Sequence, residues 1–483
     1  MFKRFSYYML ATIIPQIVAL GTLPIFTRQL TPSDYGVIAL FLMYGTVIVG
    51  FVSLGIRAAS YKYYFEMDKE SFGKLNFTNL VFLFFVFLIT GVAGYYAAPL
   101  VSEKVFDSKI SAFYLNLSFL YACFDFLLSY YSLFLVAEKR SKAFAFFVLL
   151  RVICDNAVSL ILIFAFGMTL EGKIYGSIIG VLIPSLVVIF YLRHLITPKI
   201  QFIFLKKSIY LGAPSVLGGL TGVINTSFDR GMLANFGKLQ GLSDYHFGLR
   251  FGGIFQAFHH TIQRIWSPFF FEKIQDAGNF SHITKRFHLM VLSLGIVAVS
   301  ICLFSEELLL ILVSSEFYGA KYVIPLVVLA LFISTLNEIS IGQLTYKERL
   351  IFQFPVALVG DFTNIGLNLV AIPMYGAAGA AGATLCSSII TSCLYFYFGQ
   401  KVCPLPFSWK SLVGLLGFIF LCSSLSYGFF DLDMNGWYKF GLKLCLFSTI
   451  CVLGIRFVGH DDLHIIKSKF EGMLLKWRPG QTR

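Results

Sequence analysis

Long apolar segments separated by short polar loops dominate this chain. A helix needs roughly 20 mostly apolar residues to cross about 30 Å of hydrocarbon, and these segments hold 19 to 27 residues each. We predict fourteen transmembrane helices, at residues 9–27, 36–56, 77–100, 111–136, 143–166, 174–192, 209–235, 243–268, 287–305, 322–345, 352–373, 377–399, 411–430 and 437–455. The pattern therefore predicts an all-α polytopic membrane protein.

The basic residues between the predicted spans fall mainly on one side. Of the 38 Lys and Arg residues, 26 lie in loops on the side of the N-terminus, 7 lie in the alternate loops and 5 lie inside spans. Loops rich in Lys and Arg stay in the cytoplasm. Because fourteen spans return the chain to its starting side, we predict that both termini are cytoplasmic. This distribution accounts for the net charge of +13 without a nucleic-acid partner, since no basic domain stands apart from the spans.

A weak internal repeat divides the chain. Asp155 and Gly176 recur as Asp361 and Gly382, both at an offset of 206 residues. These matches predict that spans 1–6 and 7–12 are two copies of one six-span unit. A substrate path is then expected between the two copies, as in many transporters. The predicted domains are an N-lobe at 1–198, an interfacial linker at 199–208, a C-lobe at 209–400, two further spans at 401–459 and a cytoplasmic amphipathic tail at 460–483.

Several arginines lie inside the predicted spans, where a cation is costly and marks either a structural ion pair or a polar path. Arg151, Arg230 and Arg250 fall nearest the membrane centre, and Arg264 lies closer to the cytoplasmic end. Arg151 and Asp155 are four residues apart and share a helix face, so they can pair. The surplus of arginine over nearby acids favours a cationic cavity for an anionic substrate.

Carboxylates inside the spans are candidates for proton transfer in an ion-coupled cycle, and equally for ion pairing. The candidates are Asp155, Asp229, Asp361 and Glu338, with Asp125 a further one. We expect no cofactor and no metal. The run Gly167–Lys173 lacks the Ser or Thr of a nucleotide-binding loop and has no preceding strand, and no Cys, His or acid completes a ligand set around His259 and His260.

Short motifs along nearly the whole chain resemble a known family. Leu23-Pro24 to Asp34-Tyr35-Gly36, Gly55-Ile-Arg57, Gly212-Ala-Pro214 followed by Asp229-Arg230, and Pro373 to Ala380 carry the likeness. Together they resemble the polysaccharide-biosynthesis flippases, the Wzx-type O-antigen transporters of the multidrug/oligosaccharidyl-lipid/polysaccharide superfamily. The peptidoglycan-precursor flippases are relatives that fit less well, because the first two spans carry only Arg28 and Arg57, at their ends.

The resemblance implies a function and a partner. It implies a non-enzymatic flippase of the bacterial inner membrane that moves undecaprenyl-pyrophosphate-linked oligosaccharide repeat units to the periplasmic leaflet by alternating access. It also implies surface polysaccharide synthesis alongside a polymerase and chain-length proteins. The candidate substrate-binding residues are Arg151, Arg230, Arg250, Arg264, Arg57 and Arg28.

Two other functions stay open at this point. A polysaccharide polymerase or O-antigen ligase needs a sizeable outer loop with catalytic groups, yet the outer loops at 101–110 and 306–321 carry no His or Arg. A drug/cation antiporter of the same superfamily is expected to line its cavity with acidic rather than basic residues.

Overall fold

The structure, a computed structural model, describes residues 2–236, 239–430, 432 and 434–455, and nearly all of them are helical. The N-terminal half comprises α1 (Phe2–Gln29), α2 (Pro32–Val52), α3 (Ile56–Glu66), α4 (Lys69–Lys104), α5 (Ala112–Ala137), α6 (Ser141–Phe166), α7 (Leu170–Tyr191) and the 3-10 turn η1 (Arg193–Leu195). The rest comprises α8 (Phe202–Phe236), α9 (Leu239–Lys273), η2 (Ala277–Asn279), α10 (Phe280–Leu303), α11 (Ser305–Leu312), η3 (Ser315–Tyr322), α12 (Ile324–Thr335), α13 (Asn337–Tyr346), η4 (Leu350–Phe352), α14 (Gln353–Val402), α15 (Trp409–Phe430) and α16 (Gly436–Ile455).

Every predicted span falls on helix. Ten segments of the described chain are long and apolar enough to cross a membrane, with α12 and α13 together forming one of them. The remaining predicted spans fall on α1, α8 and α9 and on the second arm of α14. The expectation of an all-α polytopic membrane protein is therefore confirmed.

The long helix α14 is two antiparallel spans joined at a sharp break. Gly376 has a φ of 57° and a ψ of −129°, a conformation that only glycine adopts without strain. Gly379 then packs so tightly on the backbone of Ala371 that an added Cβ would lie 2.1 Å from that carbonyl oxygen. The glycines of this stretch thus allow the two arms to approach closely, as small residues do between membrane helices.

Local sequence also determines where α2 begins. The Thr31 hydroxyl accepts a hydrogen bond from the Asp34 amide at 3.2 Å, and the Asp34 carboxylate accepts one from the Thr31 amide at 2.8 Å. Pro32 occupies the first turn. This capping box satisfies amide groups that would otherwise lack partners at the end of a membrane helix.

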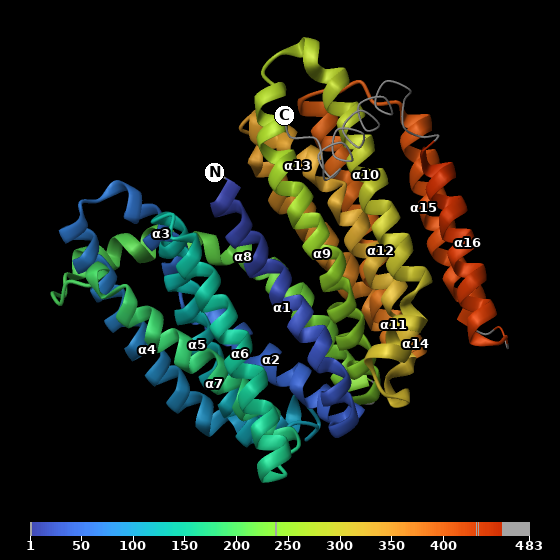
Figure 1. Ribbon diagram of the computed structural model, residues 1–483. Helices are drawn as coiled ribbons and strands as arrows, with labels where there is room; N and C mark the ends of the chain where they lie inside the picture. Colours follow the sequence, from blue (N-terminus) through green and yellow to red (C-terminus); the bar gives the residue numbers. More distant parts are fainter. Residues whose placement is uncertain (1, 237–238, 431, 433, 456–483) are drawn as a thin grey trace, which may run out of the picture.

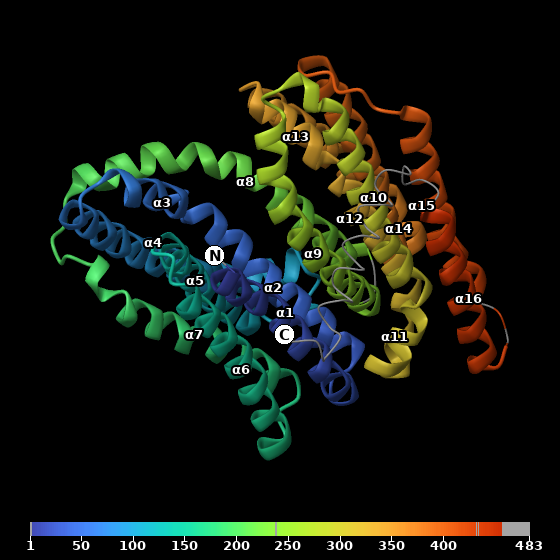
Figure 2. The same cartoon turned by 45° about the horizontal axis from the view of Figure 1, so that its top comes forward.

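The helices form two groups that converge toward one end of the molecule. In Figure 1, α3–α7 lie to the left and α9–α16 to the right, and the groups separate toward the end at which the N-terminus lies. Helix α1 runs between them. Helix α8 crosses from one group to the other (Figure 2). It begins at Phe202, inside the stretch 199–208 assigned to a linker, and the amphipathic tail at 460–483 lies outside the described residues.

Buried side chains pack within each group and also across the boundary between the groups. In the N-terminal group, Tyr130, Tyr131 and Phe134 are fully buried, and the Tyr130 hydroxyl donates to Asn76 Oδ1 at 2.8 Å. In the second group, Phe251 and Phe287 belong to a core that joins α9, α10 and α12. A further buried cluster joins α2 and α5 of the first half to α8, α9 and α14 of the second, so the halves are packed together at their boundary.

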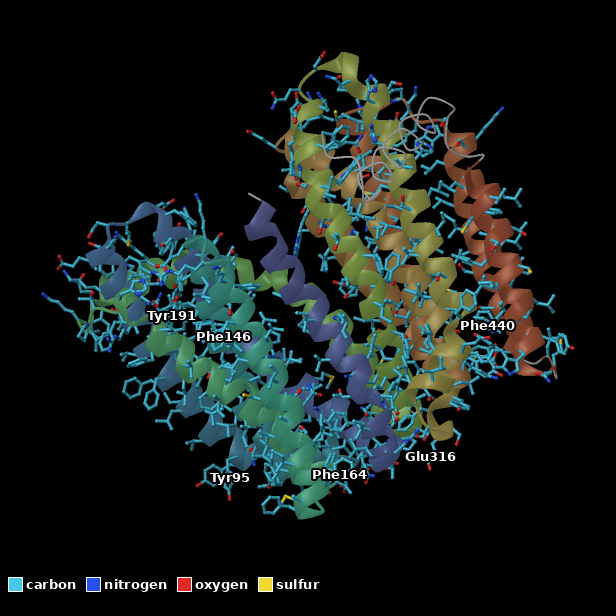
Figure 3. The ribbon with its side chains drawn as sticks, viewed as in Figure 1. Tyr95, Phe146, Phe164, Tyr191, Glu316 and Phe440 are labelled. Atoms are coloured by element: carbon cyan, nitrogen blue, oxygen red, sulfur yellow. The ribbon has the colours of Figure 1, made fainter. Side chains whose placement is uncertain are left out.

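Aromatic side chains remain exposed near both ends of the bundle. Figure 3 shows Phe146 and Tyr191 at the upper end of the N-terminal group and Tyr95 and Phe164 at its lower end. All four are exposed. Tyr and Trp favour the two membrane–water interfaces, so Tyr191 and Tyr95 indicate the two expected faces of a bilayer.

Candidate functional site between the two halves

A group of basic side chains lies where α1 meets the second half. The guanidinium of Arg250 on α9 donates to the carbonyl oxygen of Ala19 on α1 at 3.4 Å. One turn further along α9, Gly253 faces the side chain of Gln16. Arg250 thus stands at the boundary between the halves, on the surface that a central path would use.

Arg230 on α8 belongs to the same group. The ring of His246 lies within electrostatic reach of both Arg230 and Arg250. Arg230 Nε and His246 Nδ1 are buried and have no hydrogen-bond partner among the described residues. A buried donor without a partner is costly, so this site has free capacity for a polar or anionic group.

The halves meet tightly at the lower end in Figure 1. The ring of Tyr35 on α2 lies 4.8 Å from that of Phe247 on α9 and 5.2 Å from that of Phe317 on η3. A Cβ on Gly36 would lie 2.8 Å from the Leu239 carbonyl oxygen. This aromatic contact closes the interface below the basic group.

Polar contacts reinforce the closed end. The ammonium of Lys109, in the α4–α5 turn, donates to the carbonyl oxygen of Ala234 at the end of α8 and lies 3.5 Å from that of Asn235. A cation at a helix C-terminus is electrostatically favourable. Ser314 donates to the Thr27 carbonyl oxygen at 2.7 Å, which ties α1 to the second half at the same end.

Arg151 has a different partner from the one that its spacing suggests. Its guanidinium lies 2.7 Å from the Asp125 carboxylate on α5 and donates to the Tyr121 hydroxyl at 3.0 Å. The ion pair with Asp155 that the spacing allows is therefore not the one formed. Residues four apart share a helix face, but Arg151 binds the adjacent helix α5 instead, because α5 presents both the acid Asp125 and the hydroxyl of Tyr121.

Asp155 is held by α7 instead. Its Oδ1 atom accepts from the Lys173 ammonium at 2.8 Å and from the Ser177 hydroxyl at 3.1 Å. A second polar contact joins this region to α1, because the Thr22 hydroxyl donates to Asn156 Oδ1 at 3.0 Å. Helix α1 therefore touches a polar side chain of the first half and, one turn away, Arg250 of the second.

Asp229 is buried in a network of neutral donors. Tyr245 donates to its Oδ2 atom and Asn368 to its Oδ1 atom, both at 2.6 Å, and Thr384 Oγ1 lies 3.2 Å from Oδ2. Asn368 and Thr384 stand on opposite arms of α14. Asn364 lies within hydrogen-bond distance of both of them. A carboxylate at 2% exposure thus connects α8, α9 and both arms of the hairpin.

The other candidates do not join these groups. Arg28, Arg57 and Arg264 are exposed, and the Arg57 guanidinium donates to Ser129 at 3.4 Å. Glu338 accepts from Gln263 at 2.8 Å on the neighbouring helix α9, with His259 3.5 Å away.

Asp361 is half-buried on the first arm of α14, within electrostatic reach of Tyr395. Lys173, Asn368 and Thr384 are important partners that sequence reasoning missed. Uncharged polar residues are common in membrane helices, and Lys173 sits at a predicted loop, so nothing in the sequence marked them.

Comparison with known sequences places the chain in a family. The sequence model of the family described as "Polysaccharide biosynthesis protein" matches residues 25–322. The chain is also 22% identical over 420 residues to the capsular polysaccharide biosynthesis protein CapF of Staphylococcus aureus, an alignment that covers 83% of this chain and all of that protein.

Solved structures share the fold at low sequence identity. The lipid II flippase MurJ in an inward closed conformation matches with a TM-score of 0.69 and 16% identity, over 92% of this chain and 98% of that one. An inward-facing MATE-family multidrug resistance transporter of the MOP superfamily matches with a TM-score of 0.63 and 12% identity. This match covers 82% of this chain and 97% of that one. These proteins are a flippase and a transporter rather than enzymes. With its sequence match over more than half of its length and this fold, the chain belongs to the polysaccharide biosynthesis protein family.

Proposed function

We propose that this protein is a flippase for lipid-linked oligosaccharide repeat units of a surface polysaccharide, such as an O-antigen. The substrate is undecaprenyl-pyrophosphate-linked, and it passes from the cytoplasmic to the periplasmic leaflet of the bacterial inner membrane. Both termini are cytoplasmic in this proposal, as the loop charges indicate. The observation that carries it is the pair Arg230 and Arg250 around His246 at the boundary between the halves.

The chemistry of this group suits a pyrophosphate. Guanidinium groups bind phosphate oxygens through paired, charge-assisted hydrogen bonds. Arg230 retains a buried donor without a partner among the described residues. The headgroup would cross between the halves while the lipid tail stays in hydrocarbon, and polymerase and chain-length proteins would act on the delivered units.

Transport by alternating access fits the arrangement of the halves. The closed end at Tyr35 and Phe247 and the separation of the two groups toward the opposite end (Figure 1) support an inward-facing state. Opening the lower contacts and closing the upper end would expose the basic group to the other side. Such a motion would have to separate the buried contacts that α2 makes with α8 and α9.

We propose Asp229 as the residue that couples transport to a proton or a small cation. Its donors stand on α9 and on both arms of α14, so a change of charge at Asp229 would reach three helical segments at once. We expect Asp229→Asn to lower transport at least about tenfold, with folded protein retained because amide and carboxylate have the same shape. Thr384→Val, which removes one contact and keeps the charge, should transport nearly normally. Wild-type transport by Asp229→Asn would contradict the coupling role.

The flippase assignment is tested in cells that lack this gene. Lipid-linked sugars are probed with a membrane-impermeant oxidant on intact cells and on inverted vesicles. Single repeat units confined to the cytoplasmic leaflet would support translocation. Units exposed on the outer leaflet would indicate a polymerase or ligase instead, and normal polysaccharide with lost drug resistance would indicate an antiporter.

Substitutions then test the basic group. A hydrogen bond to a charged group is worth about 1.5–3 kcal/mol, so Arg230→Ala or Arg250→Ala should reduce transport roughly 10- to 100-fold at unchanged protein level. Arg193→Ala serves as the matched control, because Arg193 is exposed and stacks on Phe190. Full transport by both interface variants would overturn the proposed headgroup site.

A further inference from the structure

A pocket lies on the outer side of the C-terminal half, away from the interface between the halves. It has a volume of about 670 Å³ and lies between α12, the second arm of α14 and α15, with Ile333, Ile389, Phe396 and Leu416 among its lining residues. In Figures 1 and 2, α15 stands on the far side of the molecule from α3–α7. The lining side chains Val413 and Tyr397 are exposed, so the pocket opens where the lipid would be.

One end of this pocket is polar. Gln400 Nε2 is buried without a hydrogen-bond partner among the described residues, whereas Gln400 Oε1 accepts from the Leu405 amide at 3.0 Å. The next residue, Lys401, also lines the pocket and holds its ammonium 5.9 Å from the centre of the Tyr397 ring. Gln400 and the exposed Lys401 therefore both border the same space.

The same end is electropositive for a second reason. Helix α15 begins at Trp409, which lines the pocket and is half exposed. The first amides of a helix lack partners within the helix and carry partial positive charge. Lys410 is exposed beside them, and the described lining residues include no carboxylate. This end thus favours an anion at the level of an interfacial tryptophan.

We propose that the pocket binds an anionic glycerophospholipid, with its phosphate at Gln400, Lys401 and the start of α15. Ile389 lies twelve residues before Lys401 on one helix, which corresponds to about 18 Å. That depth matches one leaflet of a bilayer whose hydrocarbon core is about 30 Å thick. The acyl chains would lie against Ile389 and Ile333.

Native mass spectrometry of the full-length protein tests this binding. The protein is released from membranes containing equal amounts of phosphatidylglycerol and phosphatidylcholine with the same chains. One lysine near a membrane contributes about 1 kcal/mol toward anionic lipid, so we expect about a fivefold preference for phosphatidylglycerol. The double variant Gln400→Leu/Lys401→Ala should lose that preference, and Lys62→Ala, at an exposed lysine, should keep it.

One further variant and two further outcomes make the test decisive. Val413→Trp should fill the groove and reduce retention of phosphatidylglycerol while leaving the polar end intact. Equal retention of the two lipids by the wild-type protein, or an unchanged preference in the double variant, would overturn the proposal. Complete displacement of phosphatidylglycerol by undecaprenyl phosphate would identify the pocket as a site for the substrate tail and would equally overturn it.

Discussion

At the scale of single residues, the charges inside the membrane are paired across helices rather than along them. Arg151 reaches Asp125 on α5, Lys173 on α7 reaches Asp155 on α6, and Asp229 is bound by donors from α9 and α14. Such pairs hold adjacent helices together, because breaking one leaves an uncompensated charge in a poorly solvating environment. The basic group at Arg230 and Arg250 differs, since part of it lacks a protein partner.

The pairing of Arg151 leads to a double-mutant cycle. We expect Arg151→Gln and Asp125→Asn to show a coupling of about 0.5–3 kcal/mol in the free energy of unfolding, the range for residues in contact. The cycle of Arg151→Gln with Asp155→Asn should give a smaller coupling, because Asp155 is bound by Lys173. Thermal or denaturant unfolding in detergent measures both cycles, and a larger coupling to Asp155 would contradict the observed geometry.

At the scale of elements, two features fix how helices sit against one another. The arms of α14 meet through Gly379 and Ala371. At the opposite edge of the C-terminal half, the fully buried ammonium of Lys443 on α16 lies 2.8 Å from Glu307 and 3.1 Å from Glu306 on α11. Lys439 also lies 2.8 Å from Glu306. The contact between Gly379 and Ala371 is steric and responds to added side-chain volume. The contacts of Lys443 and Lys439 with the glutamates are electrostatic and respond to pH.

The steric contact predicts a matched pair of substitutions. Gly379→Ala places a methyl group 2.1 Å from a backbone oxygen, and overpacking of this kind costs about 1–3 kcal/mol. Gly382→Ala meets nothing within 4 Å and should be neutral or slightly stabilising, as alanine favours helix. The melting temperature of the purified protein measures both. Equal melting temperatures for the two variants would contradict the tight turn.

The electrostatic contact predicts a dependence of stability on pH. Burial alone would raise the pKa of Glu306, but hydrogen bonds and charge from Lys439 and Lys443 outweigh it and lower the pKa below 4.5. A lowered pKa means that the ionised carboxylate stabilises the fold above pH 4.5, and this stabilisation disappears as the pH falls below that value.

We therefore expect the melting temperature of the wild-type protein to exceed that of Glu306→Gln at pH 6. This gap in melting temperature should narrow below pH 4.5. Glu316→Gln, at an exposed position on the same side (Figure 3), should show no such gap. A gap between wild type and Glu306→Gln that stays constant from pH 6 to pH 3 would rule out the carboxylate as its source.

At the scale of the whole molecule, the closed end joins the two halves through a buried apolar cluster, an aromatic contact and a polar contact. Lys109 bridges the α4–α5 turn to the end of α8, and Tyr35 packs against Phe247 and Phe317. Opening this end must break the Lys109 contact and separate the rings.

Loss of the Lys109 contact should favour opening of that end. In a background without the nine native cysteines, a cysteine in place of the buried Thr27 is labelled with a membrane-impermeant maleimide applied outside. We expect Lys109→Ala to raise the labelling rate roughly 10- to 100-fold, as one lost charge-assisted hydrogen bond is worth about 1.5–3 kcal/mol. Lys104→Ala, at an exposed position on α4, should leave it unchanged. Slower labelling in Lys109→Ala would contradict this role.

The number and order of helices could be predicted because each depends on local sequence. A hydrocarbon core about 30 Å thick requires long apolar runs. Thr31 and Asp34 cap the start of α2, and Gly376 breaks α14 into two arms. The site was only partly predictable. The sequence marks Arg230 and Arg250 as unusual charges, but their closeness depends on how α8 packs against α9. Asp229 was identified without its partners, because Asn368 lies 139 residues away in sequence.

The buried Lys443 has a consequence for biosynthesis. Helix α16 is the least apolar of the candidate spans in the described chain, and a lysine within it adds about 2.5–3.5 kcal/mol to insertion at the helix centre. Its counter-charges, Glu306 and Glu307, are synthesised more than 130 residues earlier. Helix α16 therefore depends for its place in the membrane on a C-terminal half that has already begun to assemble. Neutralising both glutamates should leave α16 exposed to glycosylation or protease on the wrong side, even though no residue of α16 itself has changed.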